Sequence, residues 1–161
     1  MSELNPYADF LDGRPLETIL AATPRAIAEY LDILGPNQSR KPAPGKWSAA
    51  EIVSHLADCE IVFAFRLRQT LAEDEHVIQP FDQDYWALQY PGVSAALALA
   101  TLSAVRQWNL RLIQSVLPAA AGKTVTHPER GPMTLQTIVE TMAGHDLNHL
   151  AQLRRLAELP A

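Results

Sequence analysis

His145 and His149 lie four residues apart near the end of the chain. On an α-helix, side chains at this spacing project from one face, about 40° apart around the axis, so two such imidazoles can bind one metal ion. The apolar residues that share this face within about 80° are Ile138, Met142, Leu153 and Leu156. Charged side chains lie opposite, and both histidines are therefore predicted to point into the protein. Two neighbouring imidazoles inside a core are costly unless they share a partner.

A third candidate ligand, His55, lies on the polar stripe of a segment that is otherwise apolar. The stripe consists of Glu51, Asp58, Cys59, Val62, Arg66 and Gln69. A helix that is apolar around most of its circumference is largely buried, so this stripe is expected to line a polar interior pocket. Three histidines from two helices leave an open position on a metal ion, which is typical of catalytic sites. Zinc and nickel come first among the ions for such a site, and manganese and iron stay open.

Each of these residues also has a plainer interpretation. A histidine pair at this spacing is common by chance, and His55 alone could be a solvent-facing residue on a polar stripe. Cys59, one turn after His55, is a metal ligand, a reactive thiol or a small core residue. Arg66 either binds an anionic substrate or pairs with a nearby acid. His76 and His127 fall in predicted loops, where we expect them to be solvated.

Four helical segments are expected to position these residues. They cover residues 23–34, after a short helical piece over 16–22, and residues 48–73, 94–117 and 134–158. Ser48 and Glu51 match a capping box, and Thr23 and Pro24 are residue types favoured at a helix start. Pro118 is predicted to end the third helix.

Three further features bear on the arrangement of these helices. Gly144 has no Cβ and allows another backbone to come close to the last helix. Residues 74–92 form a long connection, and such connections usually carry function or a crossover. Strand patterns are scarce, and only residues 123–126 hint at one. Four amphipathic helices of this length predict an all-α four-helix bundle.

Composition narrows the class of protein. The chain has 161 residues, of which 48% are hydrophobic and 19% charged, which predicts one globular domain over residues 1–161. The net charge of −5 and the absence of a basic patch argue against nucleic-acid binding. Residues 92–105, the longest uncharged helical stretch, are too few for a membrane span, which needs about 20. The acidic N-terminus is no secretory signal, and one cysteine, Cys59, fits a reducing, cytoplasmic compartment.

The order of several short motifs is more specific than any histidine pair. They are Gly45-Lys46-Trp47-Ser48 with Glu51, His55-Leu56-Ala57-Asp58 with Arg66, Pro80-Phe81-Asp82 with Trp86, Gly131 with Thr134-Leu135, and the run from His145 to Gln152. Across residues 41–156 the chain resembles the DinB-like superfamily, also called damage-inducible or bacillithiol-transferase-like proteins. The resemblance implies that His55, His145 and His149 bind a divalent metal ion.

The resemblance also implies an up-down-down-up order of the helices and a homodimer. The length of residues 74–92 permits this order, because 19 extended residues reach about 60 Å whereas a 24-residue helix is about 36 Å long. The second and third helices can therefore lie parallel, joined by a crossover.

Characterised relatives include metal-dependent transferases, so the first functional hypothesis is a low-molecular-weight-thiol S-transferase acting on a small molecule. The metal would stabilise the thiolate, and no general base stands out or is needed. Asp58 and Asp146 are predicted to orient imidazole N–H groups. Arg66, Cys59 and Trp86 are the predicted substrate-binding residues.

Two other hypotheses stay open. A metal-dependent hydrolase would use the same open position for water and would need a carboxylate base, for which Asp58 and Asp82 are candidates. A non-catalytic metal-binding stress-response protein is the third. Turnover that requires a thiol, turnover without a thiol, and metal binding without turnover distinguish the three.

Overall fold

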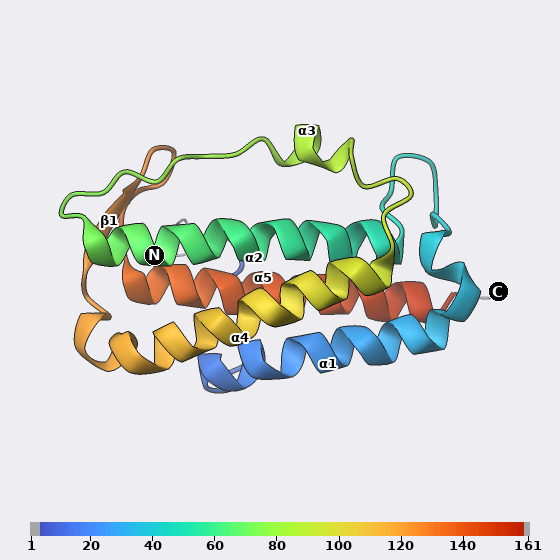
Figure 1. The fold of residues 1–161 in the computed structure, drawn as a ribbon, viewed down its shortest axis with the longest axis horizontal. Helices are drawn as coiled ribbons and strands as arrows, with labels where there is room; N and C mark the ends of the chain where they lie inside the picture. The colour runs from blue at the N-terminus through green and yellow to red at the C-terminus, as the bar shows by residue number, and fades with distance from the viewer. Residues whose placement is uncertain (1–3, 160–161) are drawn as a thin grey trace.

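Four long helices form a bundle in the computed structural model, which describes residues 4–159 (Figure 1). They are α1 (Leu16–Leu34), α2 (Ala49–Ala72), α4 (Ala95–Ala120) and α5 (Leu135–Ala157). Helices α1 and α5 run in one direction and α2 and α4 in the other, which confirms the predicted up-down-down-up order. The smaller elements are the 3-10 helices η1 (Ala8–Phe10) and η2 (Gly35–Ser39), the helix α3 (Gln83–Ala87), and the strands β1 (Thr124–His127) and β2 (Gly131–Thr134).

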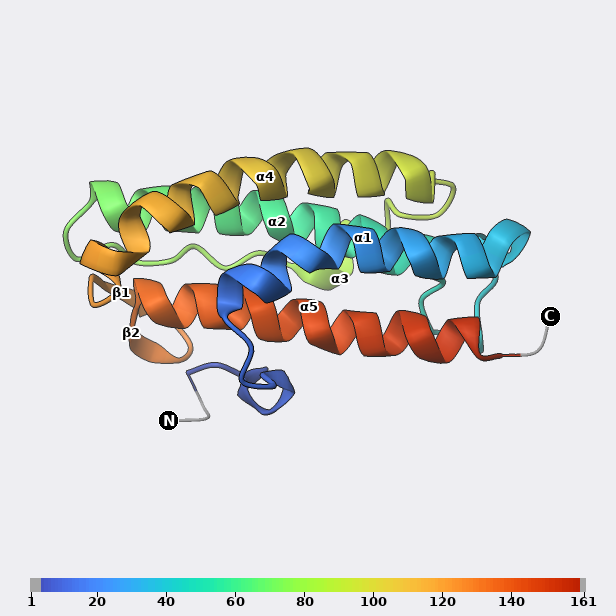
Figure 2. The same cartoon turned by 90° about the horizontal axis from the view of Figure 1, so that it is seen from below.

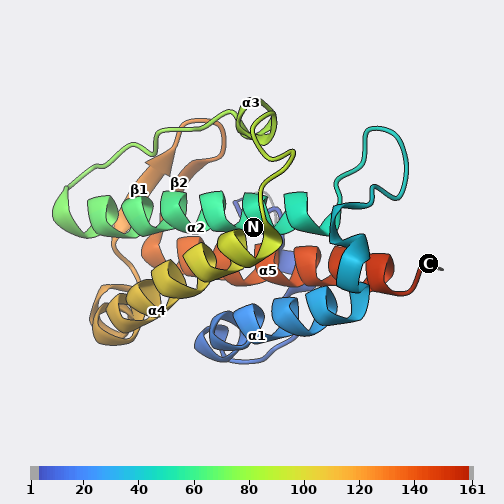
Figure 3. The same ribbon diagram turned by 45° about the vertical axis from the view of Figure 1, so that its right-hand side comes forward.

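A crossover joins the parallel helices α2 and α4 and runs back along the length of the bundle (Figures 1 and 2). It carries α3 and pairs with β1, since the Ile78 N–H donates to the Thr126 carbonyl at 2.8 Å and the Thr126 N–H donates to the His76 carbonyl at 2.9 Å. Strands β1 and β2 form an antiparallel hairpin beside this crossover (Figure 3). The sequence hinted at only one strand here. The hairpin fixes the first half of the crossover over one end of the bundle.

Local signals set the beginnings of three helices as predicted. The capping box at α2 is present: the Ser48 N–H donates to Glu51 Oε2 at 2.8 Å, and the Glu51 N–H donates to Ser48 Oγ at 3.3 Å. Ser94 and Thr134 cap α4 and α5 through their side chains. These starts depend on contacts within four residues, which is why the sequence alone predicts them.

Two predictions made from prolines are wrong. Helix α1 is continuous through Pro24, and Thr23 is not a cap, because its hydroxyl donates to the Ile19 carbonyl inside the helix at 3.0 Å. Helix α4 continues past Pro118 to Ala120. The proline ring fixes φ at a helical value, so the penalty within a helix comes from the lost N–H and from crowding of the preceding turn. In α1 a distant donor compensates the lost N–H: Arg106 Nη1 bonds the Leu20 carbonyl at 2.8 Å.

A layer of buried polar side chains separates two hydrophobic clusters. One cluster includes Ile19, Phe63, Ile113 and Met142, and the other includes Ile27, Leu56, Leu102 and Leu153. Near the boundary between the clusters, α2, α4 and α5 carry the buried polar residues His55, Glu60, Arg106, Asn109, His145, Asp146 and His149. We call these seven residues the polar belt. Among the described residues, no helix is long and apolar enough to cross a membrane.

Candidate metal centre

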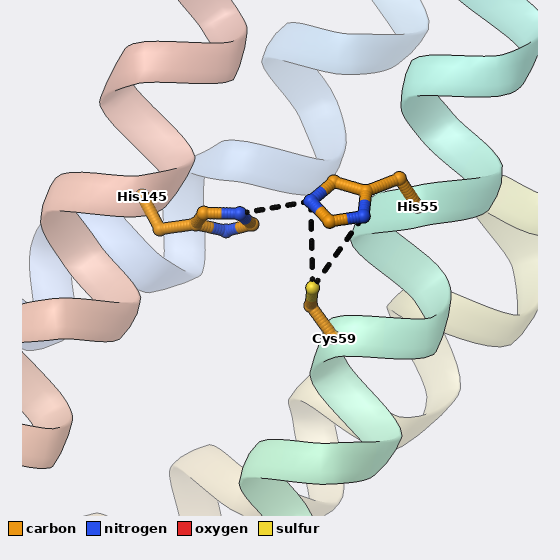
Figure 4. Close-up of side chains that lie close together, drawn as sticks. All are labelled: His55, Cys59 and His145. Carbon is orange, nitrogen blue, oxygen red and sulfur yellow. Dashed lines mark hydrogen bonds between the residues drawn. The ribbon is translucent and has the colours of Figure 1, made fainter. Parts of the chain in front are cut away.

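Three histidine side chains converge inside the bundle. The Nε2 atom of His145 lies 3.0 Å from Nε2 of His55 and 3.1 Å from Nε2 of His149. All three residues are buried, and the ring of His145 on α5 points across to His55 on α2 (Figure 4). The structure thus brings together the three residues that the sequence selected.

The donor set fits a metal ion. Imidazole nitrogens about 2.0–2.1 Å from a tetrahedral ion lie roughly 3.3 Å from one another, close to the 3.0 and 3.1 Å that separate His145 Nε2 from Nε2 of His55 and of His149. In a metal-free site, Nε2 of His145 would have to donate a hydrogen bond to one histidine and accept one from the other. A single nitrogen of a neutral imidazole carries either a hydrogen or a lone pair, so it cannot do both. A cation at the centre satisfies all three lone pairs at once, since each nitrogen then donates electrons to the ion.

Burial keeps these histidines in the neutral form that binds metal. Desolvation, aided by His149, lowers the pKa of His55 to about 3. Desolvation also lowers the pKa of His145 well below its usual value and lowers that of His149. Metal binding to this site therefore displaces few protons near neutral pH.

Gln152 orients His149, and the sequence interpretation missed this role. The Nδ1 atom of His149 lies 3.1 Å from Gln152 Oε1, an acceptor, so Nδ1 carries the hydrogen and Nε2 keeps its lone pair for the ion. The three-residue spacing of His149 and Gln152 could have indicated this contact, because a residue three positions after a helical histidine lies one turn along on the same side.

Cys59 adds a sulfur to the centre. Its Sγ lies 3.5 Å from Nε2 and 3.7 Å from Nδ1 of His55 (Figure 4). Ligand atoms of His55, Cys59 and His145 all lie within 4.8 Å of one another, so these three form an alternative donor set in which the sulfur takes the place of His149. Without a metal, burial raises the pKa of the Cys59 thiol far above its ordinary value, so the metal-free protein holds an unreactive thiol.

The two aspartates predicted to orient the imidazoles have other partners. Asp146 accepts hydrogen bonds from Arg106 at 2.6 and 3.2 Å. Asp58 accepts one from the Tyr90 hydroxyl at 2.8 Å. The physical reason is helix geometry: Asp146 follows His145 directly and so projects about 100° away from it. The prediction that adjacency makes these acids imidazole partners is corrected accordingly.

A cavity of about 190 Å³ opens onto the centre, and both Cys59 and His145 line it. The predicted substrate residue Arg66 lines the same cavity. So does His127, which the sequence placed in solvent; it is buried because the hairpin turns over this end of the bundle. Glu129 also lines the cavity and was not singled out by the sequence.

Trp86 and Asp82 do not line the cavity at the metal centre. Trp86 packs on Phe81 with ring centroids 4.8 Å apart, and it lines another hollow, of about 440 Å³, together with Asp58 and Tyr90. The carboxylate of Asp82 caps α3 by accepting from the Tyr85 N–H at 2.9 Å. Neither residue lines the cavity at the centre, because the crossover places both on the side of α3.

The N-terminal segment closes one side of the centre. The Tyr7 ring lies edge-on to His145 with centroids 5.0 Å apart. This approach requires Gly144, where a Cβ would come within 2.5 Å of the Tyr7 carbonyl oxygen. The prediction that Gly144 admits another backbone is therefore confirmed.

Comparison with known proteins places this arrangement in a family. The model of the DinB superfamily matches residues 19–153. The chain belongs to the DinB superfamily. The match covers most of each of the four long helices and all three histidines of the centre.

Relatives within the DinB superfamily carry names that refer to metal. The chain is 27% identical over 115 residues to "Putative metal-dependent hydrolase OB0782" of Oceanobacillus iheyensis, covering 71% of this chain and 67% of that protein. It is 26% identical over 137 residues to "Putative metal-dependent hydrolase BcerKBAB4_2443" of Bacillus mycoides, covering 84% and 79%. The solved structure of YfiT from Bacillus subtilis, described as a probable metal-dependent hydrolase with an unusual four-helix bundle topology, superposes with a TM-score of 0.81 at 21% identity, covering 88% and 83%. That likeness shows the fold.

Proposed function

We propose that this protein is a divalent-metal-dependent hydrolase whose ion is held by His55, His145 and His149. The observation that carries the proposal is the convergence of three buried Nε2 atoms at 3.0 and 3.1 Å. The names of the superfamily relatives support the same class of activity. A divalent ion held by three imidazoles lowers the pKa of a water at its open position toward about 7 and polarises a substrate carbonyl or phosphoryl oxygen.

Residues that line the cavity supply the other groups that a hydrolase needs, namely a proton acceptor and side chains that exclude water. Glu129 is the carboxylate that lines it, and we assign to Glu129 the acceptance of the proton from the attacking water. Asp58 and Asp82, the bases considered from sequence, bond Tyr90 and the α3 backbone instead. Tyr7 and Phe63 cover the centre and exclude bulk water, which strengthens electrostatic interactions within it.

The thiol S-transferase hypothesis uses the same open position for a thiolate and stays a prediction, as do the cytoplasmic location and the homodimer. The relatives' names favour the hydrolase. The choice rests on one comparison, which is turnover of ester, amide and phosphoester substrates with and without a low-molecular-weight thiol.

Metal content is the decisive first experiment. Tag-free protein, dialysed against zinc, nickel or manganese, is expected to retain about one equivalent per chain by mass spectrometry. His149→Ala and His55→Ala should abolish retention, whereas His76→Ala, a loop histidine paired with Glu73, should leave it unchanged. Retention by the His149→Ala and His55→Ala proteins would disprove the site. Metal bound without turnover of any substrate would disprove the hydrolase.

A further inference from the structure

We propose that the cavity beside the metal centre recognises a carboxylate of the substrate through Arg66 and Arg130. The inference rests on the proposed function, because it assigns the substrate class of the same site. It follows from charges that the fold gathers around this cavity and leaves without an ion pair among residues 4–159.

Arg66 is the first of these charges. It lies half-buried on α2, and its Nε atom is buried without a hydrogen-bond partner. Its guanidinium carbon lies 5.9 Å from the ring centroids of both Phe63 and Phe81, so aromatic faces flank it. Among residues 4–159 no carboxylate forms an ion pair with it. An unpaired cation that has lost part of its water is costly, and a bound anion removes that cost.

Arg130 adds a second positive charge at the exposed rim of the cavity. The two guanidiniums repel each other: burial lowers the pKa of Arg66, and Arg130 lowers it further. The residues lining the cavity include one carboxylate, that of Glu129, against two guanidiniums. Apart from the metal ion, the lining carries one uncompensated positive charge, which suits a monoanionic carboxylate.

His127 provides a neutral donor beside the two arginines. Its Nδ1 accepts the Glu129 N–H at 3.2 Å, so in the neutral ring the hydrogen lies on Nε2. Burial and the charges of both arginines lower the pKa of His127, which keeps this ring neutral at pH 7. A carboxylate oxygen can thus receive one neutral and several charge-assisted hydrogen bonds.

The same cavity connects this charged end to the metal centre. His145 and Cys59 line it together with Arg66 and Arg130. Arg66 lies close enough to Cys59 for its charge to oppose the effect of burial on the thiol pKa. A volume of about 190 Å³ is below the usual range for drug-sized ligands, about 300–1,000 Å³, which points to a short substrate. A reacting group at the ion and a carboxylate a few bonds away fit this space.

Paired ligands test the inference directly. Cobalt-loaded protein is titrated with 3-mercaptopropionate and with its neutral analogue 3-mercaptopropionamide, and binding is followed by the sulfur-to-cobalt charge-transfer absorption. We expect the carboxylate to bind about tenfold more tightly or better, the effect of one hydrogen bond to a charged group. Arg66→Met and Arg130→Met should each reduce this preference severalfold, because they weaken binding of the carboxylate more than binding of the amide. Arg111→Met, which removes an exposed charge on α4, is the matched control and should keep the full preference.

The outcomes separate the two proposals. Equal affinity of the wild-type protein for both ligands overturns the carboxylate site and leaves the metal centre intact. Failure to bind cobalt overturns the metal centre, and the carboxylate site is then tested in metal-free protein with propionate against propionamide, read by the NMR signal of the Arg66 side chain. A saturable shift with propionate alone, lost in Arg130→Met, supports the site, and no shift overturns it. Arg66→Gln, which removes the charge but stays polar, replaces Arg66→Met if that variant does not fold, and the same loss of preference is expected.

Discussion

The guanidinium of Arg106 bonds the carbonyl of Leu20 at 2.8 Å, in the position where Pro24 has no N–H to donate. The same group bonds Glu60 at 2.7 Å and Asp146 at 2.6 Å. It therefore ties α4 to α1, α2 and α5 at once. Glu60 and Asp146 directly follow Cys59 and His145 in the chain, so this one side chain sets how the two ligand-bearing helices lie against each other.

Arg106→Met should be strongly destabilising. It leaves two buried carboxylates without their cation, and removing one partner of a buried pair costs about 3–5 kcal/mol. We expect a loss of this size in the free energy of unfolding, measured by urea denaturation of metal-free protein. Arg25→Met, at an exposed pair with Glu29, should change stability little. Equal effects of the two substitutions would refute the role assigned to Arg106.

Gly144→Ala should displace the N-terminal segment. The new Cβ would meet backbone and Cβ atoms of Tyr7 at 2.5–2.8 Å, which cannot rotate away as a flexible side chain could. We expect a loss of about 1–3 kcal/mol, typical of overpacking, and faster proteolysis near residues 5–10. Gly122→Ala is the control, because nothing lies within 4 Å of its Cβ position. Unchanged proteolysis of the Gly144→Ala protein would contradict the close approach.

Cys59→Ala should separate the two candidate donor sets. If His55, His145 and His149 hold the ion, the variant keeps about one cobalt per chain, and the resting protein without added thiol shows no sulfur-to-cobalt charge-transfer band. Because His149 completes this set with a neutral nitrogen, we expect that result. Loss of cobalt from the Cys59→Ala protein, with retention by His149→Ala, would favour the set of His55, Cys59 and His145.

Metal-free protein should lose stability as the pH falls below about 6.5. In the folded state the pKa of His55 drops from 6.5 to about 3, whereas in the unfolded chain it returns to 6.5. Between these values the unfolded state binds more protons, so unfolding becomes easier as pH falls, by up to about 1.4 kcal/mol per pH unit per histidine. Urea denaturation between pH 7.5 and 5, with a chelator present, measures this slope, and His55→Leu should reduce it. A flat profile in the wild-type protein would contradict the buried neutral histidines.

The features that the sequence predicted correctly are those that depend on contacts between residues close together in the chain. The capping box of Ser48 and Glu51, the helix starts at Ser94 and Thr134, and the shared face of His145 and His149 depend on neighbours within four residues, and all were correctly predicted. The resemblance carried in the motifs implied what periodicity could not show, namely the parallel packing of α2 and α4. It also strengthened the selection of His55, which the polar stripe on its helix had already indicated.

Only the tertiary structure decided the contacts between distant segments. Pro24 did not begin a helix, because a guanidinium 82 residues further along the chain satisfied the carbonyl that proline left free. Asp146 pairs with Arg106, because α4 packs on that side of α5. His127 was buried rather than solvated, because the hairpin folded over the bundle. Spacing along a helix determines which side chains share a face, but the neighbours of that face depend on how whole helices pack, and no local pattern encodes that choice.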